Sequence, residues 1–111
     1  MSGEAIVAEA RKLIGSKYLF GGQSPDGFDS AGLVVYVFKK VAQKTLPHVM
    51  GDLVNQGKKV TKKNLKPGDL IFINQSHVGI YSGDGKYIHS KKMVGVKEDT
   101  FKKFYSGRRI L

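Results

Sequence analysis

The first half of the chain carries apolar residues at helical spacing. One stripe predicts a first helix, preceded by Ser2 as N-cap and stopped by Gly15, with apolar members Ile6, Val7, Ala10, Leu13 and Ile14. A second helix is predicted from Asp29 or Ser30 to about Lys44, with apolar members Leu33, Val34, Val37, Phe38, Val41 and Ala42. Turn-forming residues at 18–27 predict a structured loop between them, and a short third helix is predicted at 52–56.

The period changes to that of strands in the second half, after Pro67-Gly68. Strands are predicted at 69–73, 77–81, 86–90, 93–97 and 108–111, with a hairpin turn at 82–85. Helices followed by an antiparallel sheet indicate an α+β fold. We expect one domain spanning residues 1–111.

Composition narrows the class of protein. The chain is 41% hydrophobic and 25% charged, which is typical of a globular domain and excludes wholesale disorder. No apolar run approaches the ~20 residues of a membrane span, and the N-terminus lacks a charged segment followed by an apolar one, so we expect neither a membrane partner nor a signal peptide. The absence of cysteine excludes disulfides and thiolate zinc sites.

The positive charge is concentrated in the second half. Residues 1–57 hold six Lys/Arg and five Asp/Glu, whereas residues 58–111 hold thirteen and four. This asymmetry favours an anionic partner over a merely solvated surface. Nucleic acid is not expected, because the aromatic residues are not interleaved with the basic pairs as a base-stacking platform requires.

Two places carry candidate chemistry. Asp29 and Ser30 stand where a loop enters the second helix, a setting that stabilises an anion and suits a nucleophile. Taken alone, this feature is more typical of an ordinary N-cap. His77 and His89 fall on neighbouring strands, and an odd-numbered hairpin loop places both on one face as a base with its orienter. A metal site is disfavoured, because the Asp and Glu residues are expected elsewhere and supply no third ligand.

Five blocks together resemble the NlpC-type peptidoglycan endopeptidases, which are papain-like cysteine peptidases. They cover nearly the whole chain, in the family's order: Tyr18–Gly22, Gly27–Val34, Leu65–Phe72, His77–Tyr81 and Tyr87–His89. The resemblance implies a papain-like fold with N-terminal helices packed on a C-terminal antiparallel sheet. It implies peptidoglycan stem peptides as substrate, cut near bonds between D-glutamate and a diamino acid, without cofactor or metal.

The resemblance also assigns roles to residues. Ser30 stands at the position of the catalytic cysteine, His77 matches the general base, and His89 matches the residue that orients it. Asp29 matches a position associated with the free amino end of the stem peptide. Tyr18 matches a tyrosine that lines the site. His48 stands where the family commonly has arginine after Leu-Pro; two interpretations are open, a substrate-groove residue or no role, and we favour the second.

The departure at Ser30 is decisive for activity. A thiol at a helix N-terminus beside an imidazolium ionises with a pKa of ~3.5–7.5, whereas a serine hydroxyl has no comparable ionised population. We therefore predict that the Ser30 form has little or no peptidase activity. An engineered Cys→Ser change explains the other retained site residues better than a naturally non-catalytic copy does.

Other functions stay open as alternatives. They are a naturally non-catalytic wall-binding module of the same fold, a papain-like amidase or acyltransferase, and, least favoured, a working serine hydrolase. The basic second half is expected to help hold the domain on anionic wall polymers. We expect a monomer. The resemblance fits a domain excised from a secreted, conjugation-associated or phage tail protein, so localisation is left open.

Overall fold

The computed structural model describes residues 2–111, and its α-helices lie in the first half of the chain. Helix α1 (Gly3–Lys12) is capped by Ser2, whose side chain accepts a hydrogen bond from the Ala5 N–H, as predicted. Helix α2 (Ser30–Ala42) has Asp29 as its N-cap, and α3 (Met50–Leu53) is a single turn that begins two residues earlier than predicted. None of the helices described over residues 2–111 combines the length and apolar character needed to cross a bilayer.

An antiparallel six-stranded sheet makes up the second half. Its spatial order is β3-β8-β4-β5-β6-β7. The strand bounds are β3 (Lys58–Val60), β4 (Leu70–Asn74), β5 (His77–Gly83), β6 (Lys86–Lys91), β7 (Gly95–Thr100) and β8 (Ser106–Arg109). The predicted α+β fold is confirmed, and the C-terminal strand crosses back to lie between β3 and β4.

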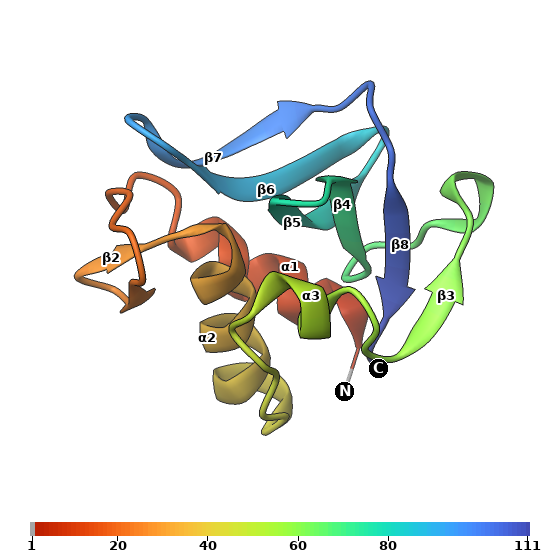
Figure 1. Cartoon of the computed structure of the whole chain (residues 1–111), viewed down its shortest axis with the longest axis horizontal. Coiled ribbons are helices and arrows are strands. Elements are labelled where there is room, and N and C mark those ends of the chain that lie inside the picture. The colour runs from red at the N-terminus through yellow and green to blue at the C-terminus, as the bar shows by residue number, and fades with distance from the viewer. Residues whose placement is uncertain (1) are drawn as a thin grey trace.

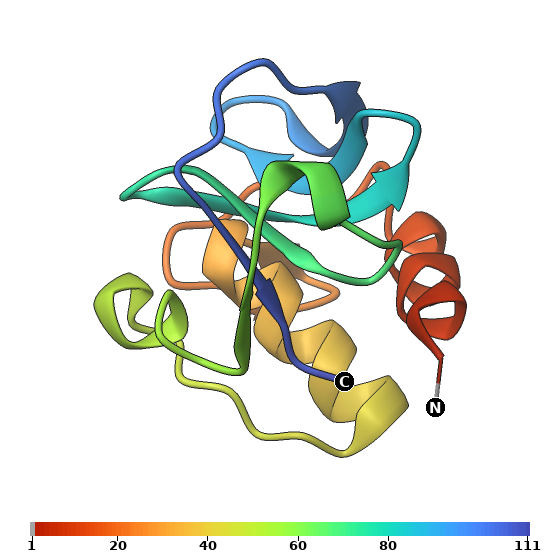
Figure 2. The same cartoon turned by 90° about the vertical axis from the view of Figure 1, so that its right-hand side faces the viewer.

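The core lies between the helices and one face of this sheet (Figure 1). Helix α2 supplies four fully buried side chains, Leu33, Val34, Val37 and Phe38, and packs against β5 and β6. From the sheet come Leu70, Phe72, Val78, Ile80 and Ile88, which are equally buried. The view in Figure 2 shows α1 and α2 on the same side of the sheet, with the long connection from α2 to β3 running beneath it.

Several details of the pattern-based prediction are wrong. The loop 18–27 contains a small hairpin of β1 (Gln23–Ser24) and β2 (Gly27–Phe28). Strand β3 and the 3-10 turn η1 (Lys62–Asn64) were not predicted, because a lysine-rich segment gives no apolar alternation. Ile14 is 44% exposed, since α1 ends before it.

Candidate active site

A β-bulge places His77 and His89 on the same face of the sheet. Near the turn Gly83 pairs with Lys86, but further along Tyr81 pairs with Tyr87, so one extra residue is taken up between them. Without it, the two-residue turn would send the histidines to opposite faces, because side chains alternate along a strand. The bulge thus supplies the odd count on which the sequence-based expectation depended.

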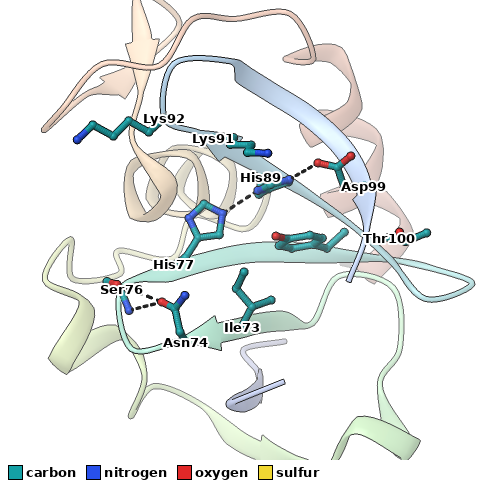
Figure 3. A pocket seen from close by; sticks show the side chains of 10 residues that line it. Ile73, Asn74, Ser76, His77, His89, Lys91, Lys92, Asp99 and Thr100 are labelled. Atoms are coloured by element: carbon teal, nitrogen blue, oxygen red, sulfur yellow. Dashed lines mark hydrogen bonds and ion pairs between the residues drawn. The ribbon is translucent and has the colours of Figure 1, made fainter. Parts of the chain in front are cut away.

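The two imidazoles and a carboxylate form a hydrogen-bonded chain across three strands (Figure 3). His77 Nε2 lies 2.7 Å from His89 Nδ1, and His89 Nε2 lies 2.8 Å from Asp99 Oδ2. The rings of the histidines meet edge to face at 88°. The expectation that no acidic residue lies near the pair is therefore wrong: Asp99, on β7, completes the chain.

Tyr87 holds His89 from the side. Its ring is stacked on the imidazole of His89, with centroids 4.1 Å apart and planes 13° from parallel. Burial raises the pKa of Tyr87 to about 12, and the negative charge of Asp99 adds to that effect. The phenol therefore stays protonated at neutral pH. The imidazole of His89 is held by stacking on Tyr87 and by its hydrogen-bond contacts with His77 and Asp99.

The surroundings of His77 and His89 keep both imidazoles neutral. Burial lowers the pKa of His77 to about 4, and smaller electrostatic contributions from His89 and Lys91 act in the same direction. Burial also lowers the pKa of His89, although its hydrogen bond to Asp99 opposes this. Burial acts to raise the pKa of Asp99, but hydrogen bonds from His89 and Lys97 outweigh it and lower the pKa. At neutral pH Asp99 is therefore a carboxylate, and the imidazoles of His77 and His89 are uncharged.

A cavity of about 590 Å³ opens beside this chain. Its lining comes from β4 to β7 and the connections between them, and it includes His77, His89, Asp99, Lys91 and Lys92 (Figure 3). The two lysines give its rim positive charge. Within residues 2–111, no group of three or more metal-ligating side chains is arranged to hold one ion.

Asp29 organises the start of α2. Its Oδ1 accepts a hydrogen bond of 2.7 Å from the Gly32 N–H, which caps the helix, and its Oδ2 accepts one of 3.0 Å from the Gly21 N–H in the preceding loop. His48 Nε2 lies 2.8 Å from the same Oδ1, and His48 Nδ1 lies 2.8 Å from Gln23. His48 thereby ties the α2–α3 connection to the loop that precedes α2.

Ser30 follows as the first residue of α2, with 8% of its surface exposed. It stands at the positive end of the helix dipole, as the sequence indicated. It is not among the described residues that line the 590 Å³ cavity. The helix start is fastened to the sheet through Phe28, whose carbonyl accepts a 2.7 Å hydrogen bond from the buried Ser90 hydroxyl, next to His89.

Tyr18 lies beside the same segment. It forms a parallel bridge with Phe28, two residues before Ser30, and its side chain is half-buried. The structure thus brings Tyr18, Asp29 and His48 together around the start of α2. It brings His77 and His89 together with Asp99 on the sheet. Asp99 was missed because the predicted strand stopped at residue 97, which left Asp99 outside it.

The comparisons with known proteins point to one family. The sequence model of the NlpC/P60 family matches residues 15–111, which is most of the chain. The chain belongs to the NlpC/P60 family. Its structure agrees: the NlpC/p60 domain of the peptidoglycan hydrolase SagA superposes with a TM-score of 0.92 at 33% identity, over 98% of this chain and 99% of that domain.

Relatives of this NlpC/P60 chain are longer proteins. Gamma-DL-glutamyl hydrolase of Bacillus subtilis (strain 168) is 40% identical over 98% of this chain and 29% of its own length. Probable endopeptidase p60 of Listeria monocytogenes serovar 1/2a is 41% identical over 85% of this chain and 20% of its own length. The chain therefore spans less than a third of these relatives.

Proposed function

We propose that the chain is the hydrolase domain of a cell-wall endopeptidase of the Cys-His-His type, silent because Ser30 occupies the nucleophile position. The observation that carries this is the hydrogen-bonded pair of neutral imidazoles on the sheet, fastened through the Ser90–Phe28 bond to the start of α2. Family membership supports the same reading, as do relatives named as peptidoglycan hydrolases and endopeptidases.

The roles follow from which atoms remain available. Nε2 of His77 is hydrogen-bonded to His89, so Nδ1 is the nitrogen left to accept a proton from a nucleophile at position 30. A thiol there loses its proton to Nδ1, attacks the scissile carbonyl, and the imidazolium returns the proton to the leaving amine. The N–H groups at the start of α2 stabilise the negative charge that develops on the thiolate and on the carbonyl oxygen.

A hydroxyl at position 30 weakens the first of these steps. The neutral imidazole of His77, whose pKa is about 4, is a weak base and draws almost no proton from an alcohol. A thiolate would form an ion pair with the imidazolium and raise the pKa of His77. The site is thus suited to a cysteine, and we expect the Ser30 form to be inactive.

The substrate we propose is the stem peptide of peptidoglycan, cleaved between D-glutamate and the following diamino acid. A second candidate is a γ-linked glutamate polymer. It is favoured by the similarity to gamma-DL-glutamyl hydrolase over 98% of the chain and by Lys91 and Lys92 at the cavity, which attract carboxylates.

The first experiment is the Ser30→Cys change. Both forms are incubated with purified peptidoglycan and with a γ-glutamate polymer, and the products are analysed by mass spectrometry. Cleavage by the cysteine form alone is expected, and the fragment masses name the bond. If neither form cleaves peptidoglycan, the γ-glutamate polymer or other amides, the proposal of a hydrolase domain is wrong and a binding module is favoured. Cleavage by the Ser30 form would overturn the claim of silence.

Alkylation measures whether position 30 communicates with His77. In S30C the rate of reaction with iodoacetamide is expected to stay high below pH 7, because an imidazolium partner stabilises the thiolate. In the double variant S30C/H77A, the reactivity is expected to move toward the profile of an ordinary thiol, near pH 8.5. Identical profiles would show that the two residues do not form a catalytic pair.

We further propose that the basic second half holds the domain on anionic wall polymers. Lys62 Nζ lies 5.8 Å from the ring centroid of Phe101, so η1, with Lys62 and Lys63, meets the segment that carries Lys102 and Lys103. Binding to purified walls is expected to weaken as salt rises and when anionic polymers are extracted from the walls. Binding that is insensitive to both would contradict this proposal.

A further inference from the structure

We propose that Asp99 is a positioning residue that sets the proton positions of both histidines, and thereby leaves Nδ1 of His77 free to act as the base. Its importance for catalysis rests on the proposed function. The proton positions themselves do not, and they can be measured in the chain as it stands.

The argument begins with the carboxylate, because an ionised carboxylate only accepts hydrogen bonds. Asp99 Oδ2 lies 2.8 Å from His89 Nε2, so Nε2 must carry the hydrogen. A neutral imidazole carries one hydrogen, and Nδ1 of His89 is therefore an acceptor. His77 Nε2 lies 2.7 Å from that acceptor and must donate to it. Nδ1 of His77 is then left with a lone pair.

One carboxylate thus selects two tautomers in succession. In its absence, either direction of the hydrogen bond between the histidines satisfies both rings. The reversed direction makes His77 Nε2 the acceptor and puts the hydrogen on Nδ1, where it blocks the base. The direction of the hydrogen bond between His77 and His89 is therefore set by Asp99, which lies at the opposite end of the series from His77.

Neighbouring side chains fix the imidazole of His89 and contact the carboxylate of Asp99. The side chain of His89 is only 4% exposed and is stacked on Tyr87, so its ring keeps one plane. Lys97 Nζ lies 3.2 Å from Asp99 Oδ1, the oxygen that the imidazole does not use, so the two contacts of the carboxylate are separate. The charged groups facing the chain are Lys91 and Lys97, and both disfavour a second proton on His89.

Asp99 and His89 lie on the same face of two neighbouring strands, β7 and β6. Tyr87 is the direct partner of Asp99, and His89 is the direct partner of Lys97. The carboxylate therefore reaches His89 diagonally across the β6–β7 ladder, a distance that a short aspartate side chain covers. Adjacent to it, Glu98 points to the other face, where Arg11 and Ser82 bind it.

The test reads the histidine ring nitrogens by ¹⁵N NMR at pH 7 in the Ser30 chain. We expect the Nε2–H form for both His77 and His89. In Asp99→Ala the His77 signals should move toward the Nδ1–H form or a mixture of the two. Lys97→Met is the matched control, because it removes the partner of the other carboxylate oxygen, and it should leave both tautomers unchanged.

Two results would overturn the proposal. One is an Nδ1–H form of His77 in the unaltered chain, and the other is an unchanged tautomer in a folded D99A variant. If D99A does not fold, Asp99→Asn serves instead, because it keeps the shape and presents one donor and one acceptor. A mixed His77 tautomer is then expected, and an unmixed Nε2–H form contradicts the proposal.

Activity gives the separate catalytic arm. In the S30C form, D99A is expected to lower kcat on the order of 10- to 100-fold with little change in KM, and K97M to leave kcat nearly unchanged. In S30C/H89A, adding D99A should lower kcat no further, since Asp99 acts only through His89. A full additional loss would overturn the positioning role. Inactivity of S30C itself would count against the proposed function and leave the NMR result standing.

Discussion

Two histidine–aspartate pairs flank the site, and they differ in which partner is buried. At the start of α2, His48 Nε2 lies 2.8 Å from Asp29 Oδ1, and the side chains are 30% and 17% exposed. On the sheet, His89 Nε2 lies 2.8 Å from Asp99 Oδ2, and the side chains are 4% and 32% exposed. The contacts are of equal length, but the more buried group is the carboxylate in the first pair and the imidazole in the second.

The difference shows what each pair does. Asp29 binds the backbone N–H groups of Gly21 and Gly32, so its pair holds main chain in place. Nδ1 of His89 is hydrogen-bonded to His77, so the His89–Asp99 pair orients the side chain of His77. A similar contact therefore serves loop architecture at one end of the site and proton placement at the other. Variants should separate these two contributions.

The largest expected effect is on the reaction. In the S30C form, His77→Ala should lower peptidoglycan hydrolysis on the order of 10²–10⁴-fold, because the general base is lost. His48→Ala should lower it about 10-fold or less, because that histidine acts through the loop. Release of soluble fragments measures both. Equal losses would abolish the distinction between the two regions.

The next effect is on stability and reverses the ranking. Asp29→Ala should lower the free energy of unfolding by about 2–3 kcal/mol, because it removes a helix cap and two further hydrogen bonds. Asp99→Ala should lower it by about 1 kcal/mol or less, since Asp99 is itself 32% exposed on the edge strand β7 and its pair holds no main chain. Urea unfolding of the Ser30 chain tests this. A larger loss for D99A would contradict the assignment of the structural role to Asp29.

The buried imidazole predicts a dependence on pH. The pKa of His77 is about 4 when folded and near 6.5 when unfolded, so the unfolded chain binds more protons between these values. The resulting stability is present above pH 6.5 and is lost as the pH falls toward 4. Because His77 is partly open to solvent, we expect a loss of about 1–2 kcal/mol. His77→Gln should flatten this part of the stability profile, and an unchanged slope would refute the assignment.

The smallest effect concerns the bond that joins the two regions. Ser90→Ala should lower the free energy of unfolding by about 1 kcal/mol, because the Phe28 carbonyl loses a buried donor. In the S30C form the same change should lower hydrolysis by about 10-fold, since position 30 is then less firmly placed relative to His77. Ser82→Ala, on the neighbouring strand, is the comparison variant for stability. Full activity of S30C/S90A would show that the bond does not position the nucleophile.

Much of the fold is predictable from local patterns. The stripes of α1 and α2, the cap at Ser2 and the strands β4, β5 and β6 are strong periodic signals that burial reinforces. The element β3 is not predictable in this way. Its residues Lys58 and Lys59 are exposed, and it becomes a strand only because β8 returns to pair with it.

The site divides along the same line. Local features of the sequence indicated the candidates Asp29, Ser30, His77 and His89, because a polar residue at a helix start and histidines flanking a turn need no knowledge of the fold. Tyr18 became a candidate only through the family resemblance. The register of the hairpin was beyond these local features, since one bulged residue decides whether the histidines meet, and bulges depend on the packing of the whole sheet.

The sequence by itself therefore determined the residue types, the α+β order of elements and the serine at position 30. Only the tertiary structure decided the partners: Asp99 for His89, His48 for Asp29 and Ser90 for Phe28, which are separated by 10, 19 and 62 positions. Such pairs leave no periodic signal along the chain. They form because a buried polar group must find a hydrogen-bond partner, and the packed sheet and helix determine which one lies within reach.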